Sequence, residues 1–419
     1  MKVVITYFFV WGNHPALSLA ELLSALTRWG IPFVLKNASI EAGILEVSEY
    51  LSPAFMTELG GTVKFGIVES SLKGSVTPDA LTSMIRKEGG GKLTFGLSAY
   101  RADNFSPITS ARELKRLGGQ LKKIFQTHQS VRFIAGIDRN LSSVTVAKNK
   151  LIEKGIEIAI LSAKRGFLLG RTTAVQPFED YSTRDYGRLS VDPNSGMLPP
   201  KLAQMMLNLS SATAKDIILD PFCGSGTILQ EALLMGWHHV VGSDVSKRAV
   251  EDTKKNLIWL KNRYGLKTSV VRLFSSDARK LSEHFQKNAV SAVITEPHLG
   301  PPLKARFDRH TAERVRDELE ALYFLSFVDF KKYLKPHARV VMVWPVFLIK
   351  GRGDNTVSIG MTKALEKQGF FLTVPFKEEI LEHSLGGLTQ RGGFIYGRPK
   401  QKVWREIVVF EYNNSKRET

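Results

Sequence analysis

Apolar residues follow two different patterns along this chain. In the first 175 residues, short runs such as VVITYFFV (3–10) and IEIAILSA (156–163) are typical of strands, whereas ARELKRLGGQLKKIFQTH (111–128) has helical spacing. From residue 199 onward, apolar β-branched runs alternate with helical patterns, which favours a doubly wound, mostly parallel sheet. The pattern therefore predicts α+β structure followed by an α/β domain.

The α+β part divides into two regions. Residues 1–75 read as a strand, a helix and a strand, followed by a short helix and another strand, and Gly89, Gly90 and Gly91 form a flexible break. Residues 76–175 are predicted to hold the long helix and five strands: LTFGLSAYR (93–101), VRFIAG (131–136), VTVAKN (144–149), IEIAILSA (156–163) and GFLLGRTTAV (166–175). Residues 176–198 are polar with Pro and Gly, and we interpret them as a linker.

The α/β domain spans residues 199–419. Its strands are predicted at IILD (217–220), VVGSD (240–244), TSVVRLFSSD (268–277), AVSAVITEP (289–297) and RVVMVWP (339–345), with a long helix near 311–335. Ligands bind such sheets at the carboxyl ends of the strands. The loops that follow these runs are therefore where we look for chemistry.

Composition limits the class of protein. The 419 residues are 43% hydrophobic and 23% charged, which is ordinary for a globular chain with a core. The one cysteine, Cys223, excludes an intrachain disulfide and favours a reducing compartment, so we expect a cytoplasmic protein. No apolar run is long enough to span a membrane, and the first residues read as a strand rather than a signal peptide.

The net charge of +18 is unevenly distributed. Residues 101–150 hold ten basic and three acidic residues, a local charge of +7. A clustered excess of this size favours a nucleic-acid partner over a membrane surface, although a merely solvated face would look similar. Five of these basic residues lie on the predicted helix: Arg112, Lys115, Arg116, Lys122 and Lys123.

The string DPFCGSGT (220–227) follows the first strand of the α/β domain. Gly224 and Gly226 allow a tight turn and let a ligand approach the backbone, and Asp220 can accept from a ligand ammonium or from loop amides. An ordinary strand-to-helix turn is the alternative. We interpret Cys223 as a small buried residue rather than a nucleophile, because no base lies near it in sequence.

Two more carboxylates end the next strands. Asp244 can accept from both hydroxyls of a ribose, unless it caps the following helix, and Asp277 can accept from an adenine amine, unless it lies in a solvated turn. A nicotinamide dinucleotide fits poorly, because Leu229 stands where the third glycine of its fingerprint is needed. A ligand with a cationic end, a ribose and an adenine fits better, and S-adenosyl-L-methionine (SAM) has all three.

The loop TEPHLGPP (295–302) ends the fourth strand. Methyl transfer to an exocyclic amine needs an acceptor for the amine hydrogens and a wall that clamps the base. Glu296 can supply the acceptor, Pro297 stiffens the turn and His298 can stack, although a proline-rich structural loop is the alternative. The histidines and carboxylates show no metal-ligand spacing, so we expect no metal.

These motifs resemble those of the THUMP-domain tRNA guanine-N2 methyltransferases. The resemblance rests on DPFCGSGT, Asp244, Asp277 and the 295–300 loop, and it extends over nearly the whole chain. FFVWGNHPALSLAEL is similar to the family's amino-terminal ferredoxin-like piece, and the run from FGLSAY to DYSTRDYGR is similar to its THUMP domain and linker. The implied fold is a Rossmann-like class I methyltransferase domain (α/β) preceded by α+β ferredoxin-like and THUMP domains.

The resemblance also implies roles for residues. The SAM-binding positions are Asp220, Pro221, Phe222, Gly224, Gly226, Thr227, Asp244 and Asp277. The catalytic positions are Glu296, Pro297 and His298. The implied partner is RNA, with tRNA as the first expectation, gripped in part by the basic helix. Whether a protein partner is also needed is left open.

The catalytic motif departs from the family. The family carries Asp-Pro-Pro-Tyr where this chain has Glu296-Pro297-His298-Leu299, and a leucine cannot stack on a base as a tyrosine does. Two other interpretations therefore stay open: an RNA-binding scaffold with a catalytically impaired domain, and a DNA amino-methyltransferase.

Overall fold

The computed structural model describes residues 4–85, 92–190, 197–266, 270–302, 306–350, 355–398 and 401–413. The glycines expected to form a break, Gly89, Gly90 and Gly91, lie outside the described residues. The chain forms two compact units. Unit 1 comprises residues 1–178 and 378–386, and unit 2 comprises residues 179–377 and 387–419.

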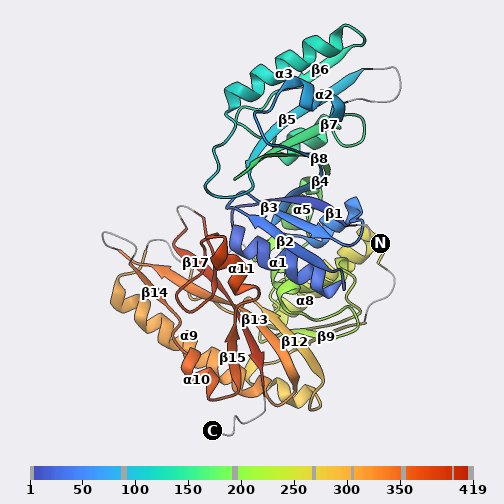
Figure 1. The fold of residues 1–419 in the computed structure, drawn as a ribbon. Coiled ribbons are helices and arrows are strands. Elements are labelled where there is room, and N and C mark those ends of the chain that lie inside the picture. Colours follow the sequence, from blue (N-terminus) through green and yellow to red (C-terminus); the bar gives the residue numbers. More distant parts are fainter. Residues whose placement is uncertain are drawn as a thin grey trace. The chain divides into compact units, whose positions relative to one another are not determined.

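Unit 1 is built on one eight-stranded sheet, in the order β2-β3-β1-β4-β8-β7-β5-β6 (Figure 1). The strands are β1 (Ile5–Trp11), β2 (Phe33–Ala38), β3 (Ala42–Val47), β4 (Thr62–Leu72), β5 (Leu93–Arg101), β6 (Val131–Ile134), β7 (Ile156–Ala163) and β8 (Gly166–Val175). Its helices are α1 (Pro15–Arg28), η1 (Pro53–Glu58), α2 (Pro78–Ile85), α3 (Ala111–Gln126), α4 (Ser143–Lys148) and α11 (Lys377–Glu382), nearly all of which groups with this unit.

The sheet runs without a break through the two regions distinguished in the sequence, because β4 pairs antiparallel with β8. A buried polar cluster also joins them. The Lys64 ammonium donates to Glu157 Oε1 and to the Leu141 carbonyl, each at 2.6 Å, and the Glu157 carboxylate also accepts from Ser98 and Thr172. Every charge in this cluster is paired, so we interpret it as structural.

One predicted strand is wrong. Residues 144–149 do not form a strand, because α4 occupies Ser143–Lys148. The Ser142 side chain accepts from the Thr145 amide and caps the helix, and Val146 is the residue it buries. The β-branched valines and threonine suggested a strand, but the cap and the single buried position select a helical turn.

Unit 2 has a nine-stranded sheet whose main order is β11-β10-β9-β12-β13-β17-β15, with β14 paired to β13 and β16 to β17 (Figure 1). The five strands from β11 to β13 are parallel, whereas β17 and β15 are antiparallel additions. The strands are β9 (Ile217–Asp220), β10 (His239–Asp244), β11 (Val270–Ser275), β12 (Val290–Thr295), β13 (Leu334–Leu348), β14 (Thr356–Ser358), β15 (Phe370–Thr373), β16 (Phe394–Tyr396) and β17 (Val403–Tyr412). The expected doubly wound α/β fold is confirmed.

The helices of unit 2 alternate with its parallel strands. They are α5 (Phe178–Tyr186), α6 (Pro200–Leu209), α7 (Thr227–Leu234), α8 (Lys247–Tyr264), η2 (Ala278–His284), α9 (Arg309–Phe330) and α10 (Thr362–Glu366). The segment interpreted as a linker thus contains α5. Tyr181 and Arg184, three residues apart on this helix, are buried, and the Tyr181 hydroxyl bonds to Gln204 of α6.

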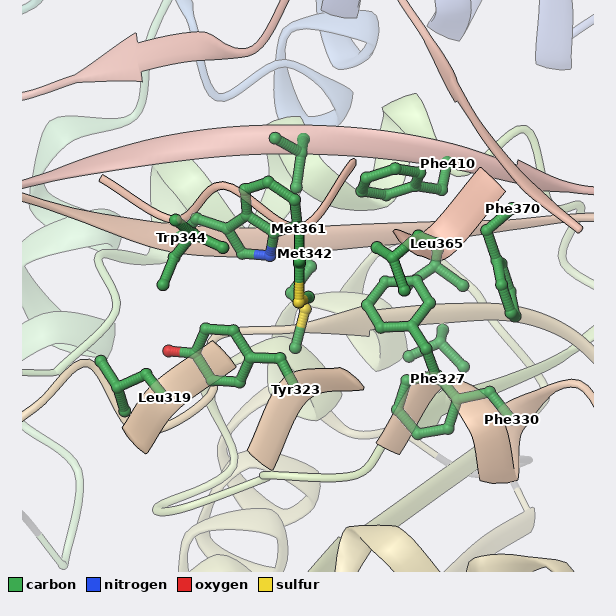
Figure 2. Close-up of a cluster of buried hydrophobic side chains, with 14 of the residues drawn as sticks. Leu319, Tyr323, Phe327, Phe330, Met342, Trp344, Met361, Leu365, Phe370 and Phe410 are labelled. Atoms are coloured by element: carbon green, nitrogen blue, oxygen red, sulfur yellow. The ribbon is translucent and has the colours of Figure 1, made fainter. Parts of the chain in front are cut away.

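The core of unit 2 lies between α9 and the sheet. Figure 2 shows Tyr323, Phe327 and Phe330 of α9 beside Met342 and Trp344 of β13. Some of the aromatic rings pack edge to face. Phe327 and Phe410 of β17, for example, form a T-shaped pair with their ring centroids 5.4 Å apart. This packing covers β12 and β13, whose carboxyl ends lead to the candidate site. Among the described residues, no helix is long and apolar enough to cross a membrane.

Candidate functional site

The site begins where the strand order of unit 2 reverses, between β9 and β12. These strands are parallel neighbours, so their carboxyl ends lie at the same edge of the sheet. Asp220 is the last residue of β9, and Glu296 directly follows Thr295, the last residue of β12. The Thr295 hydroxyl donates to Asp220 Oδ1 at 2.7 Å and ties the two strand ends together. Such a reversal opens the crevice in which α/β proteins bind ligands.

The loop after Asp220 has the backbone that the glycine spacing predicted. Gly224 and Gly226 have φ values of 52° and 84°, in the left-handed region that favours glycine. A Cβ on Gly226 would lie 2.8 Å from Thr253 Cγ2, whereas a Cβ on Gly224 would meet nothing within 4 Å. Gly226 is therefore needed for packing, and the space over Gly224 is open to a ligand.

Two residues that the sequence reasoning missed hold this loop in place. The Thr253 hydroxyl donates to the Gly224 carbonyl at 2.7 Å, and Asn256 Nδ2 donates to the Ser225 carbonyl at 3.0 Å. Both lie on α8 and are fully buried. The signal was their helical spacing of three, on the side of α8 that also carries Leu257 and Leu260.

Asp244 lies beside the loop at the end of β10. Its Oδ2 accepts from the Gly224 amide at 3.0 Å, and its Oδ1 accepts from the Ser246 amide at 2.9 Å. The helix-cap alternative for Asp244 is wrong, because Ser246 caps α8 by accepting from the Ala249 amide. Each carboxylate oxygen retains a lone pair, so Asp244 can still accept from two further hydroxyls.

Asp277 is less available than its neighbours. It caps η2, and its carboxylate accepts from both the backbone amide and the guanidinium of Arg279. These bonds lower the pKa of Asp277, first of all the bond to the Arg279 side chain. Asp277 does follow β11 next to Asp244, since the Ser276 amide donates to the Asp244 carbonyl at 3.1 Å.

Asp220 is a carboxylate of this edge with a strongly raised pKa. It is 2% exposed, and this burial raises its pKa to about 7. The hydrogen bonds from Thr295 and the Phe222 amide oppose the rise, whereas the charges of Asp244 and Glu296 add to it. A buried carboxylate facing two like charges lacks a cation. A ligand with a cationic end would supply it, which is the property that SAM offers.

Replacing Asp220 with Asn is expected to stabilise the ligand-free protein in alkaline solution. The folded pKa of about 7 lies above the ordinary 3.8, so the folded state binds the extra proton between those values and stability falls as pH rises through them. Asn keeps an acceptor for Thr295 and removes the charge. Urea unfolding should show D220N more stable by roughly 4 kcal/mol at pH 8, with the difference vanishing near pH 4. A variant no more stable than the parent at pH 8 would contradict the raised pKa.

Glu296 is joined to a residue that the sequence reasoning missed. The Arg405 guanidinium, on β17, forms an ion pair with the Glu296 carboxylate through Nε and, at 3.4 Å, through Nη2. Both side chains are 12% exposed. Burial raises the pKa of Glu296, and Arg405 opposes that rise. The pair leaves free lone pairs on the carboxylate for a substrate hydrogen.

The rest of the 296–300 loop is held by a residue of the hydrophobic core. Pro297 is buried, whereas the His298 side chain is exposed. The His298 carbonyl accepts from the hydroxyl of Tyr323, a fully buried residue of α9. Figure 2 shows Tyr323 inside the core between Leu319 and Met342. The core thus fixes the loop backbone and leaves the His298 ring free to meet a ligand.

The remaining loop residues lie close to the turn. Pro221 and Thr227 are buried, Phe222 is half-buried, and Cys223 is 4% exposed. Burial raises the pKa of the Cys223 thiol well above its ordinary value, which suits a packing residue. Among the described residues, no group of three or more His, Cys, Asp or Glu could hold a metal ion.

Fold and site together define a Rossmann-like α/β domain with a candidate ligand crevice at the reversal of its strand order. Residues 189–345 match the family of RMKL-like methyltransferase domains (UPF0020). This part of the chain is therefore similar to methyltransferase domains.

Curated relatives narrow the comparison. The chain is 43% identical over 135 residues to the tRNA (guanine(10)-N2)-dimethyltransferase of Methanothermobacter thermautotrophicus, covering 32% of this chain and 37% of the relative. It is 28% identical over 194 residues to the enzyme of the same name from Methanocaldococcus jannaschii, covering 46% of this chain and 53% of the relative. The chain thus spans about half or less of the length of these relatives. Over the stretch matched, the resemblance to tRNA guanine-N2 methyltransferases is confirmed.

A solved structure extends the comparison of folds. TrmN from Thermus thermophilus superposes with a TM-score of 0.55 at 19% identity, over 97% of this chain and 99% of that one. At this identity the likeness concerns the fold alone. The assignment of residues 76–175 to a THUMP domain, and of 1–75 to a ferredoxin-like domain, stays a prediction.

Proposed function

We propose that this chain is a SAM-dependent methyltransferase that modifies an exocyclic amine of an RNA base, with guanosine N2 in tRNA as the substrate. The observation that carries the proposal is that the mostly buried acid Glu296 lies beside the glycine loop that begins at Asp220. Glu296 and Asp220 end neighbouring strands, joined by Thr295, within a domain of the methyltransferase family. The activity for which the curated relatives are named supports the choice of tRNA guanine.

The residues around the loop offer a partner for each group of SAM. The open space over Gly224 admits the ligand against the backbone, and the raised pKa of Asp220 favours a cationic group beside it. Asp244 would accept from the ribose hydroxyls. Asp277 would accept a hydrogen bond from the adenine amine, because its carboxylate oxygens retain lone pairs beside the bonds from Arg279. Pro221, Phe222, Gly226 and Thr227 would shape the walls.

When bound, SAM supplies an electrophilic methyl group on a sulfonium. The chain's part is to present the nucleophile. Glu296 would accept a hydrogen bond from the target amine, hold its lone pair toward the methyl group and take up the proton that leaves nitrogen. Pro297 would keep this loop in one conformation, and the exposed His298 ring would stack on the extruded base. Transfer is direct, without a covalent enzyme intermediate.

The RNA would be gripped in part by α3. Its apolar face, with Leu114, Leu117 and Leu121, is buried in unit 1. Of the basic side chains predicted to bind RNA, Lys122 is half-buried and the others, Arg112, Lys115, Arg116 and Lys123, are exposed. The helix therefore presents a row of cations to solvent, as phosphate binding requires. As part of this proposal, the protein works on tRNA in the cytoplasm.

Reversing Lys115, Arg116, Lys122 and Lys123 to Glu is expected to weaken tRNA binding at least tenfold and to flatten its salt dependence. Each lost phosphate contact removes about one released counterion from the slope of log affinity against log salt concentration. Filter binding between 50 and 300 mM salt measures both. The matched control reverses four exposed lysines of unit 2, Lys254, Lys255, Lys363 and Lys367. An unchanged slope in the α3 variant, or an equal change in the control, would count against this surface.

The direct test of the proposed function is incubation with labelled SAM and, in separate reactions, total tRNA or duplex DNA. Mass spectrometry of nucleosides from cells with and without this chain then identifies the product. Incorporation into tRNA as N2-methylated guanosine supports the proposal. Tight tRNA binding without incorporation would favour a scaffold, and preferential methylation of duplex DNA would favour a DNA enzyme.

A further inference from the structure

Arg188 lies against the cofactor loop and belongs to none of the site residues discussed above. It follows α5 by two residues and is 4% exposed. Its Nη1 donates to the Thr227 hydroxyl at 2.7 Å. Thr227 is the first residue of α7 and the last of the DPFCGSGT string, so the guanidinium lies at the carboxyl-terminal end of that loop.

The other donors of Arg188 are not satisfied within the protein. Its Nε and Nη2 are buried without a hydrogen-bond partner. The closest acid, Asp185, is 3.9 Å from Nη2, which is beyond hydrogen-bond distance, and its own side chain is 33% exposed. Burial lowers the pKa of Arg188, opposed by the charges of Asp185 and Glu231. A buried guanidinium with open donors lacks an anion.

The neighbouring arginine, Arg184, has the hydrogen-bonded carboxylate partners that Arg188 lacks. Arg184, one turn earlier, donates through Nε to Glu231 of α7 at 2.8 Å and also pairs with Asp180. Arg184 and Arg188 thus contact α7 at two positions one turn apart, Glu231 and Thr227. At the second position the guanidinium has no hydrogen-bonded carboxylate and only the partly exposed Asp185 at 3.9 Å, and this position is the one at the ligand loop.

The start of α7 adds to the demand for an anion. Gly226 is its N-cap and supplies no side chain, and the first turn carries no acidic residue. The helix dipole and the free amide groups there favour negative charge. Two independent features, a helix end and a buried arginine, therefore converge on the same spot.

We infer that Arg188 binds the carboxylate of the amino-acid end of SAM. This assignment rests on the proposed function. The two charges of that zwitterionic end would then be recognised separately, its ammonium by Asp220 and its carboxylate by Arg188 with the α7 amides. Thr227 orients the guanidinium through Nη1 and leaves Nε and Nη2 for the ligand.

The test compares SAM with its decarboxylated form, which keeps the sulfonium, the ammonium and the nucleoside but lacks the carboxylate. Isothermal titration of the full chain should show that SAM binds at least tenfold more tightly. In Arg188→Met, the affinity for SAM should fall at least tenfold, since charge-assisted bonds of this kind are the strong ones. The affinity for the decarboxylated form should stay within about twofold, and Arg188→Lys should be intermediate.

Arg184→Met is the matched control. It removes a buried arginine that serves the packing of α5 on α7, so any loss of affinity should be equal for the two ligands. Equal losses in Arg188→Met would overturn the assignment and leave a structural role for Arg188. Failure of the unaltered chain to bind either ligand would instead contradict the proposed function itself.

Discussion

Replacing Glu296 with Gln is expected to reduce methyl transfer by about 10²–10⁴-fold, the usual contribution of a general base, while SAM affinity stays within twofold. Gln has the size of Glu and keeps one acceptor oxygen toward Arg405. It cannot take up the proton that leaves the amine, and its amide group presents hydrogens where the substrate's hydrogens must go. Single-turnover transfer to tRNA measures the rate, and calorimetry measures the cofactor.

Two further variants sharpen this result. Glu296→Ala should be as inactive as the Gln variant if the carboxylate itself does the work. Glu296→Asp introduces the aspartate of the family's motif, which is shorter by one methylene. The variant should keep an acidic side chain at this position but hold it farther from Arg405. Full activity in the Ala variant would refute the role assigned to Glu296.

The strand-end carboxylates were predictable because their positions follow from local sequence. Each of Asp220, Asp244 and Glu296 ends or directly follows an apolar run whose alternation with helices favours a buried parallel strand. Parallel strands place such ends at one edge whatever their order. The glycines of the loop were equally predictable, because only glycine adopts the φ of Gly224 and Gly226 without strain.

The partners of these residues were not predictable in the same way. Arg405 lies 109 residues from Glu296 and reaches it from β17, an antiparallel strand beyond β13 that no local pattern places. Arg188 lies in a segment whose polar composition indicated a linker, because its two buried arginines looked like solvent-exposed charges. Long-range contacts decide both positions, an ion pair for Arg405 and the Thr227 hydroxyl for Arg188, and hydrophobic periodicity carries no information about them.

Replacing Arg405 with Gln is expected to move the pH dependence of methyl transfer upward. Burial already raises the pKa of Glu296, and the Arg405 charge is what opposes that rise. Without it, Glu296 holds its proton to a higher pH, and a protonated carboxyl cannot accept the proton of the amine. We expect the rate at pH 7 to fall about 10²-fold and to recover in part by pH 9. The measurement is the pH at which the rate is half of its maximum on the acid side.

A structural role for Arg405 would lower the rate without moving that pH, so the shift separates the two explanations. Arg405→Lys keeps a cation and should restore the midpoint toward that of the unaltered chain. Arg391→Gln is the matched control, because Arg391 forms a comparable ion pair with Glu406, the buried neighbour of Arg405, at 3.1 Å. Breaking that pair disturbs the same strand but leaves Glu296 its counter-ion. An equal shift in both Gln variants would mean that β17 acts only as a support. A shift confined to Arg405 makes this arginine the residue that keeps the acid ionised.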